Sequence, residues 1–126
     1  MTRPVSTLFI ILACMGAAAF PRLSRAQQPQ LDCSLGPLAK TYGGSSWLVY
    51  ACSDNKSLVV VTSQGNPGSP FYFMLTPQNG KRRLFGEGTG RKSATDPAFA
   101  ELSRLTEDEI AGLIESAKKA AAPQRQ

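Results

Sequence analysis

Few side chains in this sequence are suited to catalysis. Its 126 residues include no histidine, which removes the commonest general base and the commonest metal ligand. Most of the nine acidic residues have structural roles in turns and helix starts, and Glu87 is the one carboxylate in a loop suited to function. Tyr72 lies opposite Glu87 in the expected strand register. A small hydrolase using Glu87 is therefore one hypothesis, but no second carboxylate at an assignable distance supports acid/base catalysis. We expect a protein that is not an enzyme and that has no cofactor and no metal site.

The N-terminal segment has the features of a signal peptide. Arg3 supplies a positive charge, Val5 to Ala19 is an apolar run too short for a comfortable membrane span, and Ser24-Arg25-Ala26 is a plausible cleavage site. We predict a cleaved signal peptide over residues 1–26, with cleavage after Ala18 or Ala19 as the alternative. A third and disfavoured interpretation makes Cys14 a lipidated cysteine. The expected location is the periplasm or the exterior of the cell.

Removal of residues 1–26 leaves two cysteines, Cys33 and Cys52. An even pair in an exported protein predicts a disulfide bond, and the alternative is a pair of buried thiols. Closing a loop of this length contributes about 3 kcal/mol by a chain-entropy estimate. This is useful in a small domain whose core is marginal.

The small net charge of the predicted mature chain does not call for a nucleic acid as its partner. Cleavage also removes three arginines and no acid, which leaves 11 basic and 9 acidic residues and a net charge of +2. We therefore expect no nucleic acid partner, and no membrane span once the signal peptide is removed. The expected partner is a protein or an anionic component of the cell envelope. Five basic residues come from two nearby segments, and we favour the interpretation that they protect an exposed strand edge against aggregation. The alternative is a single patch that binds an anionic partner; its members are Lys81, Arg82, Arg83, Arg91 and Lys92.

The stretch Gly86-Glu87-Gly88-Thr89-Gly90-Arg91-Lys92 allows two interpretations. Alternating glycines beside two cations could present backbone N–H groups to a phosphate. The stretch does not lie between a strand and a helix of a βαβ unit, and it matches no dinucleotide-binding or P-loop pattern. We favour a flexible exit from a strand.

Two β-hairpins must position these residues. Strands near 47–52 and 57–63 flank Asp54-Asn55, and strands near 71–76 and 81–86 flank Asn79-Gly80, the strongest short hairpin signal. The turns place Tyr50 opposite Val59 and Leu48 opposite Val61 in the first hairpin. In the second hairpin they place Leu75 opposite Leu84 and Met74 opposite Phe85. Both faces of the first hairpin are apolar, so both need to be covered.

Two helices are expected after the sheet. Asp96 as N-cap and Pro97 at the first helical position predict a helix near 97–104, with Phe99 and Leu102 facing inward. A capping box at Thr106 to Glu109 begins a second helix near 107–120. Its apolar residues recur at helical spacing on one face, which we expect to pack on the sheet; they are Ile110, Leu113, Ile114 and Ala117.

These elements make up an α+β fold: a four-stranded antiparallel meander with two C-terminal helices packed on one face. The α+β domain spans residues 47–120, after an irregular segment tethered by the disulfide over residues 27–46 and before a disordered tail over 121–126. The helices should cover the face of Trp47, Val49, Leu58 and Val60. The N-terminal segment should bring Leu31, Leu35 and Leu38 over the opposite face.

That short segment cannot cover four strands, so part of the second hairpin should stay exposed with the loop at 66–70 at its rim. We predict a binding surface there. It comprises Tyr72, Met74, Phe85, Gly86, Glu87, Gly88, Thr89, Gly90, Arg91 and Lys92.

The first hairpin resembles a known family. Tyr50-Ala51-Cys52-Ser53-Asp54 followed by Leu58-Val59-Val60 is similar to the strand pair of the periplasmic inhibitors of c-type lysozyme. Gly88-Thr89-Gly90-Arg91 is similar to the loop that those inhibitors present to their target. The chain departs from the family because Cys33 lies upstream, the strands are too few for an eight-stranded barrel, and the C-terminus is helical. The resemblance implies an exported protein-binding module, and the composition implies a small exported binding or envelope accessory protein without catalysis.

Overall fold

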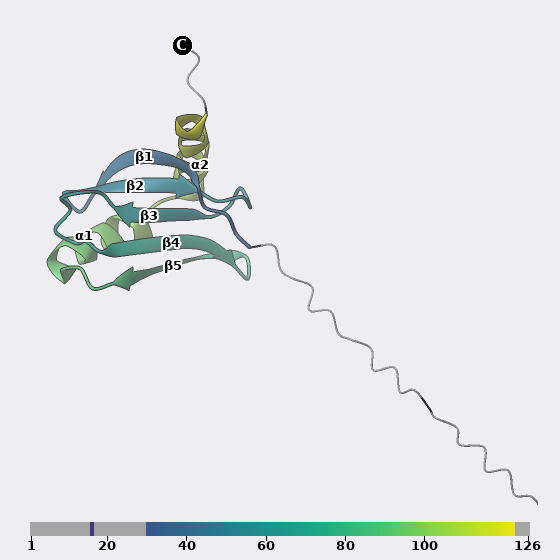
Figure 1. The fold of residues 1–126 in the computed structure, drawn as a ribbon, viewed down its shortest axis with the longest axis horizontal. Coiled ribbons are helices and arrows are strands. Elements are labelled where there is room, and N and C mark those ends of the chain that lie inside the picture. The colour runs from purple at the N-terminus through teal and green to yellow at the C-terminus, as the bar shows by residue number, and fades with distance from the viewer. Residues whose placement is uncertain (1–15, 17–29, 123–126) are drawn as a thin grey trace, which may run out of the picture.

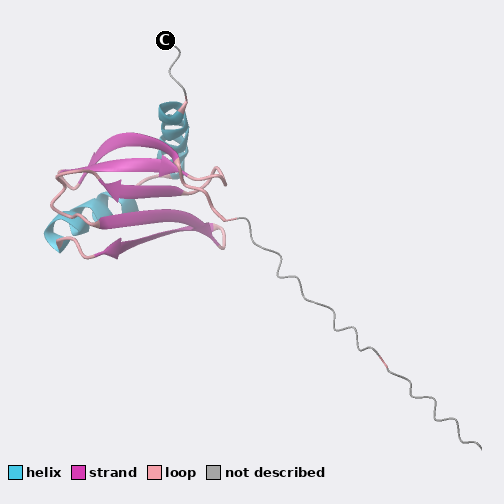
Figure 2. Ribbon diagram, in the orientation of Figure 1, coloured by secondary structure: helices cyan, strands magenta, loops and turns pink. Residues whose placement is uncertain are grey.

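The structure is a computed structural model that describes residue 16 and residues 30–122. Five strands precede two helices: β1 (Leu35–Tyr42), β2 (Ser45–Ala51), β3 (Leu58–Thr62), β4 (Phe71–Gln78), β5 (Lys81–Gly88), α1 (Lys92–Ser103) and α2 (Glu107–Ala121). The strands form one antiparallel meander in the order β1-β2-β3-β4-β5, with both helices on the same side of the sheet (Figure 1, Figure 2). The α+β class is as predicted. The predicted signal peptide, apart from residue 16, and residues 123–126 lie outside the described residues.

The sheet has five strands and not four, because part of the N-terminal segment is β1. We predicted an irregular segment over 27–46, but β1 pairs with β2 from Leu35 to Tyr42. Gly43 and Gly44 both have positive φ, +59° and +78°, and make the two-residue turn between the strands. A Gly-Gly pair is one of the residue pairs that favour such a turn. The register shifts between Leu35 and Leu38, and this irregularity hid the strand in the sequence pattern.

The predicted disulfide between Cys33 and Cys52 is present. It joins the residues just before β1 to the end of β2. Backbone hydrogen bonding strengthens the connection, since Ser53 N–H donates to the Asp32 carbonyl oxygen at 2.6 Å. The segment is therefore tethered as expected, although most of it belongs to the sheet.

The predicted registers of both hairpins are confirmed. Tyr50 faces Val59 and Leu48 faces Val61, while Leu75 faces Leu84 and Met74 faces Phe85. The Asn79-Gly80 turn has positive φ at both residues. The β2–β3 connection is longer than the two-residue turn we expected. Strand pairing ends at Ala51 and Leu58, so the loop comprises the residues between them. The Asp54 carboxylate accepts the N–H groups of Lys56 and Ser57 at 2.9 and 2.8 Å and closes this loop.

The core lies between the sheet and the two helices. The predicted sheet face is fully buried there, with Trp47, Val49, Leu58 and Val60 each 0 % exposed. The Trp47 indole N–H donates to the Tyr42 carbonyl oxygen at 3.0 Å, so its polar atom is satisfied. The helical residues packed against this face include those predicted from the periodicity of α2; they are Ala98, Leu102, Ile110, Leu113, Ile114 and Ala117.

Helix α2 begins as its sequence predicts. The Thr106 side chain accepts the Glu109 N–H at 3.2 Å, and the Glu109 carboxylate accepts the Thr106 N–H at 2.8 Å. The predicted capping box is thus complete. The helix runs one residue further than predicted, to Ala121.

Helix α1 differs from the prediction at its start. It begins at Lys92, so Asp96 and Pro97 lie inside it and Asp96 is not the N-cap. Ala94 and Thr95 are buried, and their side chains lie against Gly68 in the β3–β4 loop, so tertiary packing stabilises an earlier turn. Leu102 is buried as expected, whereas the prediction for Phe99 was wrong, since it is 44 % exposed.

Candidate functional site

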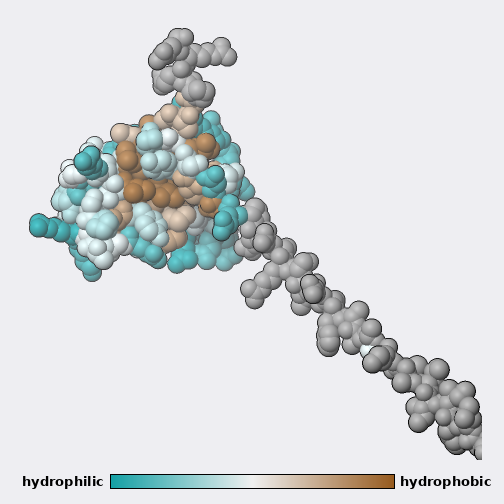
Figure 3. Space-filling view, viewed as in Figure 1, coloured by the Kyte–Doolittle hydropathy of each residue, from teal (hydrophilic) through white to brown (hydrophobic). Residues whose placement is uncertain are grey.

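The sheet face turned away from the helices carries apolar side chains at its outward positions. These side chains are partly exposed, and no described element covers them. Figure 3 shows apolar residues gathered across the middle of this face. We call it the open face and define it by Leu48, Tyr50, Val59, Val61, Tyr72, Met74 and Phe85.

We expected the N-terminal segment to bring Leu31, Leu35 and Leu38 over this face, and for Leu35 and Leu38 that was wrong. Residues 35–42 extend the sheet at its edge as β1. Leu35 and Leu38 pack against the core on the helix side. The physical reason is that β1 satisfies its backbone N–H and C=O groups by pairing with β2, which a segment lying flat across a sheet cannot do. More of the open face is left uncovered than the sequence implied.

Two rows of side chains cross the open face from strand to strand. The central row is Tyr50, Val59, Met74 and Phe85, and each residue is the Cα partner of the next. Directly paired residues share a face with Cβ atoms about 5 Å apart, so the row is a continuous apolar band. A second row runs parallel to it and ends in a charge: Leu48, Val61, Tyr72 and Glu87.

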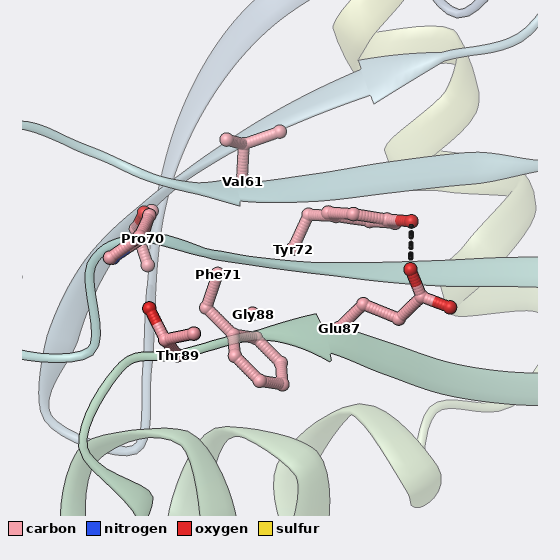
Figure 4. A pocket seen from close by; sticks show the side chains of 8 residues that line it. Val61, Pro70, Phe71, Tyr72, Glu87, Gly88 and Thr89 are labelled. Atoms are coloured by element: carbon pink, nitrogen blue, oxygen red, sulfur yellow. Dashed lines mark hydrogen bonds between the residues drawn. The ribbon is translucent and has the colours of Figure 1, made fainter.

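Glu87 and Tyr72 interact at the end of the second row. The Tyr72 hydroxyl donates to Glu87 Oε2 at 2.9 Å (Figure 4). This hydrogen bond to the carboxylate is the main cause that raises the pKa of Tyr72 above its ordinary value. A shallow depression of about 430 Å³ lies beside the pair; its lining residues are Val61, Thr62, Pro70, Phe71, Tyr72, Glu87, Gly88 and Thr89.

The chemistry of this pair is limited. Glu87 is exposed, and it is the one carboxylate among the described residues that line the depression. Glycoside hydrolysis requires two carboxyl groups about 5 to 9.5 Å apart, and the depression offers one.

The glycine-rich stretch does not form a phosphate cradle. The N–H groups of Thr89 and Gly90 both donate to the Pro70 carbonyl oxygen, at 3.1 and 3.3 Å. A Cβ at Gly86 would lie 2.5 Å from the ring of Phe71, and one at Gly90 would overlap the carbonyl of Gly68. These glycines are needed for close packing against β4 and the β3–β4 loop, so the flexible exit that we favoured is in fact a tightly packed strand end.

The five basic residues do not form one patch. Successive side chains of a strand point to opposite faces, so Arg82 and Arg83 separate. Arg82 lies on the helix side, where it forms an ion pair with Glu107 at 2.8 Å and donates to the Lys56 carbonyl oxygen at 2.6 Å. Arg83 lies on the open face, with its guanidinium 4.8 Å from the centre of the Phe85 ring. Arg91 and Lys92 follow the other end of β5, where α1 begins.

The predicted surface residues thus divide into three groups. Tyr72, Met74, Phe85 and Glu87 lie together on the open face. Gly86 and Gly88 pair with Phe73 and Phe71, at strand positions that face the helix side. Thr89, Gly90, Arg91 and Lys92 lie beyond the end of β5. Sequence reasoning missed the contribution of Leu48, Tyr50, Val59 and Val61, although their alternation in the first hairpin places them on one face.

A buried phenol is the other polar feature that the sequence did not indicate. Tyr42 is 6 % exposed, and its hydroxyl has no hydrogen-bond partner in the described part of the chain. Burial, and then the charge of Glu101, raise the pKa of Tyr42 to about 12. Tyr42 also borders a depression of about 340 Å³ between β1 and α2, with Lys40, Leu105 and Glu109 among its lining residues.

The described residues contain no metal-binding cluster and no membrane-spanning helix. Within residues 30–122, no three histidine, cysteine or acidic side chains lie close enough together to hold a metal ion. No helix of the described chain is long and apolar enough to cross a membrane. Comparison with models of protein families, with curated proteins and with solved structures finds no match to this chain.

Proposed function

We propose that this protein is a non-catalytic binding module that docks another protein surface on its open face. One observation carries the proposal. Antiparallel sheets with one solvated face usually alternate apolar side chains inward and polar side chains outward. Here most outward positions near the middle of the sheet are apolar too: Leu48 and Tyr50 of β2, Val59 and Val61 of β3, and Met74 of β4, and the apolar band continues to Phe85. Contiguous exposed apolar surface of this kind is typical of interaction sites.

The polar residues at the margin support binding over catalysis. Arg83 stacks on Phe85, and Glu87 accepts a hydrogen bond from Tyr72, so both charged groups are held at the rim of the apolar band. Protein interfaces commonly combine an apolar centre with a polar rim. A role as a small exported binding or envelope accessory protein agrees with this arrangement.

Export is part of the proposal, to the periplasm or the cell exterior. The Cys33–Cys52 disulfide supports it, because disulfides persist in oxidising compartments and are rare in the cytosol. The predicted signal peptide supplies the route. Expression of the full chain in a bacterium with an intact secretion pathway tests this: mass spectrometry of the exported protein should find a chain that starts at Gln27. A full-length chain retained in the cytoplasm would contradict it.

Site-directed photo-cross-linking tests the docking surface. A photoreactive phenylalanine analogue at Phe85 places the probe on the open face, and the same analogue at Phe99 places it on the exposed side of α1. The two positions are matched because both replace an aromatic ring with a larger aromatic ring. We expect a protein adduct from the Phe85 variant, and none or far less from the Phe99 variant.

The identity of the adduct then names the partner. Mass spectrometry of the cross-linked band distinguishes a second copy of the chain from another protein. Purified c-type lysozyme added to one reaction tests the partner that the family resemblance implies. Equal cross-linking from both positions, or none from Phe85, would contradict a docking role for the open face.

A further inference from the structure

We infer that the partner of the open face is a second copy of this chain, docked about a two-fold axis that runs along the central row. This inference rests on the proposed function, because it uses the same face, and it adds the identity of the partner. Its evidence is the placement of two opposite charges on β5. Arg83 and Glu87 both point to the open face, two residues before and two residues after Phe85.

The symmetry of this arrangement makes the face complementary to itself. Two sheets that pack face to face lie about 10 Å apart with their strands roughly aligned. A two-fold axis along the row from Tyr50 to Phe85 reverses the strand direction of the second copy. Phe85 then lies over Phe85 of the second copy, and Arg83 lies over Glu87 of the second copy. The same pairing occurs twice, as a two-fold interface requires.

An axis parallel to the strands loses this pairing. A two-fold axis parallel to the strands would place β5 over the other end of the sheet in the second copy, where the open face carries no charge on β1 or β2. Arg83 would then lie over apolar surface and lose its hydration without gaining a partner. Charge complementarity therefore selects the axis along the central row.

Both charged groups are already oriented for the contact. The Arg83 guanidinium lies 4.8 Å from the Phe85 ring centre, which keeps it on the open face. The Glu87 carboxylate is held by the Tyr72 hydroxyl at 2.9 Å, and an ionised carboxylate can accept further hydrogen bonds from a guanidinium. The net charge of the mature chain, +2, is small and does not oppose association of two copies.

The size of the face predicts a weak dimer. Four strands spaced about 4.8 Å apart, with two outward positions on β3 and about three on each of the others, span roughly 20 by 20 Å. Two such faces together bury on the order of 1,000 Å² of accessible surface, because side chains make each face rougher than a flat square. This is the lower limit for specific interfaces. Dimerisation should therefore depend on concentration in the micromolar range and weaken as salt screens the charge pairs.

Charge reversal tests the inference by sedimentation equilibrium of the mature chain with its disulfide intact. Arg83→Glu places carboxylates opposite carboxylates, and Glu87→Arg places guanidinium groups opposite guanidinium groups, so each should raise the dissociation constant roughly tenfold or more. The double variant Arg83→Glu/Glu87→Arg restores opposite charges and should recover most of the affinity. Arg104→Glu is the control, because this exposed arginine lies after α1 and the same charge change should leave the dimer unaffected.

Mixing the two single variants gives the sharpest outcome. One variant then carries two carboxylates on its open face and the other two guanidinium groups, so an equimolar mixture should form heterodimers about as tightly as the wild type, while each variant alone associates roughly tenfold more weakly or worse. Circular dichroism confirms that each variant is folded. A wild-type chain that stays monomeric at several hundred micromolar, or a dimer indifferent to both reversals, would overturn the inference.

The two proposals fail in different ways. A monomeric wild-type chain whose Phe85 probe still cross-links a different protein would remove the second copy and keep the docking surface. A dimer that cross-links from Phe99 and not from Phe85 would remove both. A Phe85 adduct of twice the mass of the mature chain, abolished by Arg83→Glu, supports both.

Discussion

At the scale of single residues, the buried hydroxyl of Tyr42 is the clearest unfavourable feature of the core. It has no hydrogen-bond partner among the described residues, and an unsatisfied buried hydroxyl costs about 1 to 3 kcal/mol. The ring itself packs in the main apolar cluster, so its aromatic surface stabilises the fold. The residue thus combines favourable packing with an unfavourable polar atom.

We predict that Tyr42→Phe stabilises the protein by about 1 kcal/mol near pH 7, because it removes the hydroxyl and keeps the ring. The effect should grow with pH. Folding raises the pKa of Tyr42 from 10.0 to about 12, so between these pH values the unfolded chain loses the phenol proton before the folded chain does. The wild-type protein therefore keeps its full stability below about pH 10 and loses stability as the pH rises toward 12. The advantage of the variant over the wild type should widen by roughly 1 kcal/mol between about pH 9 and pH 11.

Urea denaturation at several pH values measures this difference. Tyr50→Phe is the matched control, since it removes a phenol from the open face and leaves Tyr42 in place. A destabilised Tyr42→Phe variant would show that the hydroxyl has a partner after all.

The Tyr72–Glu87 pair should respond to removal of the carboxylate charge. Glu87→Gln removes the charge that favours the protonated phenol, so the pKa of Tyr72 should fall toward its ordinary value. Titration of the tyrosine Cζ carbon by NMR measures this pKa residue by residue. Glu115→Gln, an exposed carboxylate on α2, is the control and should leave Tyr72 unchanged. An unchanged Tyr72 pKa in Glu87→Gln would contradict the hydrogen bond.

At the scale of elements, close packing explains why the end of β5 is rich in glycine. A Cβ at Gly90 would overlap the carbonyl of Gly68, which belongs to the loop that also contacts Thr95 of α1. The Asn66 side chain supports this loop by donating to the Ser46 carbonyl oxygen at 2.6 Å and accepting the Gly68 N–H at 2.7 Å. The loop therefore joins β2, β5 and α1 into one packed end of the molecule.

We predict opposite effects for two alanine substitutions. Gly90→Ala forces the strand end and the β3–β4 loop apart and should destabilise the protein by about 2 kcal/mol or more. Gly112→Ala should stabilise it by about 0.5 to 1 kcal/mol, because Gly112 lies inside α2 with open space where its Cβ would be. Thermal and urea denaturation measure both changes. A neutral Gly90→Ala would show that this packing is adjustable.

At the scale of the whole molecule, a single covalent bond ties the start of the sheet to its second strand. Cys33 and Cys52 are 19 residues apart, and the loop they close contains all of β1. By the chain-entropy estimate, the bond stabilises the fold by about 3 kcal/mol. Because β1 is an edge strand with one sheet neighbour, its pairing should depend on this bond more than that of any other strand.

We predict that Cys33→Ser/Cys52→Ser lowers the melting temperature by roughly 10 to 20 °C. Hydrogen exchange should show the largest loss of protection in β1. Reduction of the wild-type protein should have the same effect, and reductant should have no effect on the double variant. Equal melting temperatures for the wild type and the double variant would contradict a stabilising role for the bond.

The sequence alone predicted the features that depend on local chemistry. The registers of both hairpins followed from turn residues and alternation, and α2 followed from its capping box at Thr106 and its helical periodicity. The disulfide followed from a count of the cysteines that remain after the predicted signal peptide is removed. In each case the relevant residues lie near one another in the chain or leave a single possible pairing, so no knowledge of the rest of the fold was needed.

Long-range packing decided the remaining features. Residues 35–42 have a strand pattern interrupted at Gly36-Pro37, and only the free edge of β2 makes them β1. The first turn of α1 is helical because Ala94 and Thr95 are buried beside Gly68, which overrides the start signals at Asp96 and Pro97. Long-range packing also decided that the open face is exposed. Alternation along the strands places its side chains on one side of the sheet, but whether they are covered depends on where the N-terminal segment packs. That segment joined the sheet edge because unpaired backbone groups are satisfied there, and the apolar face of the sheet was left uncovered.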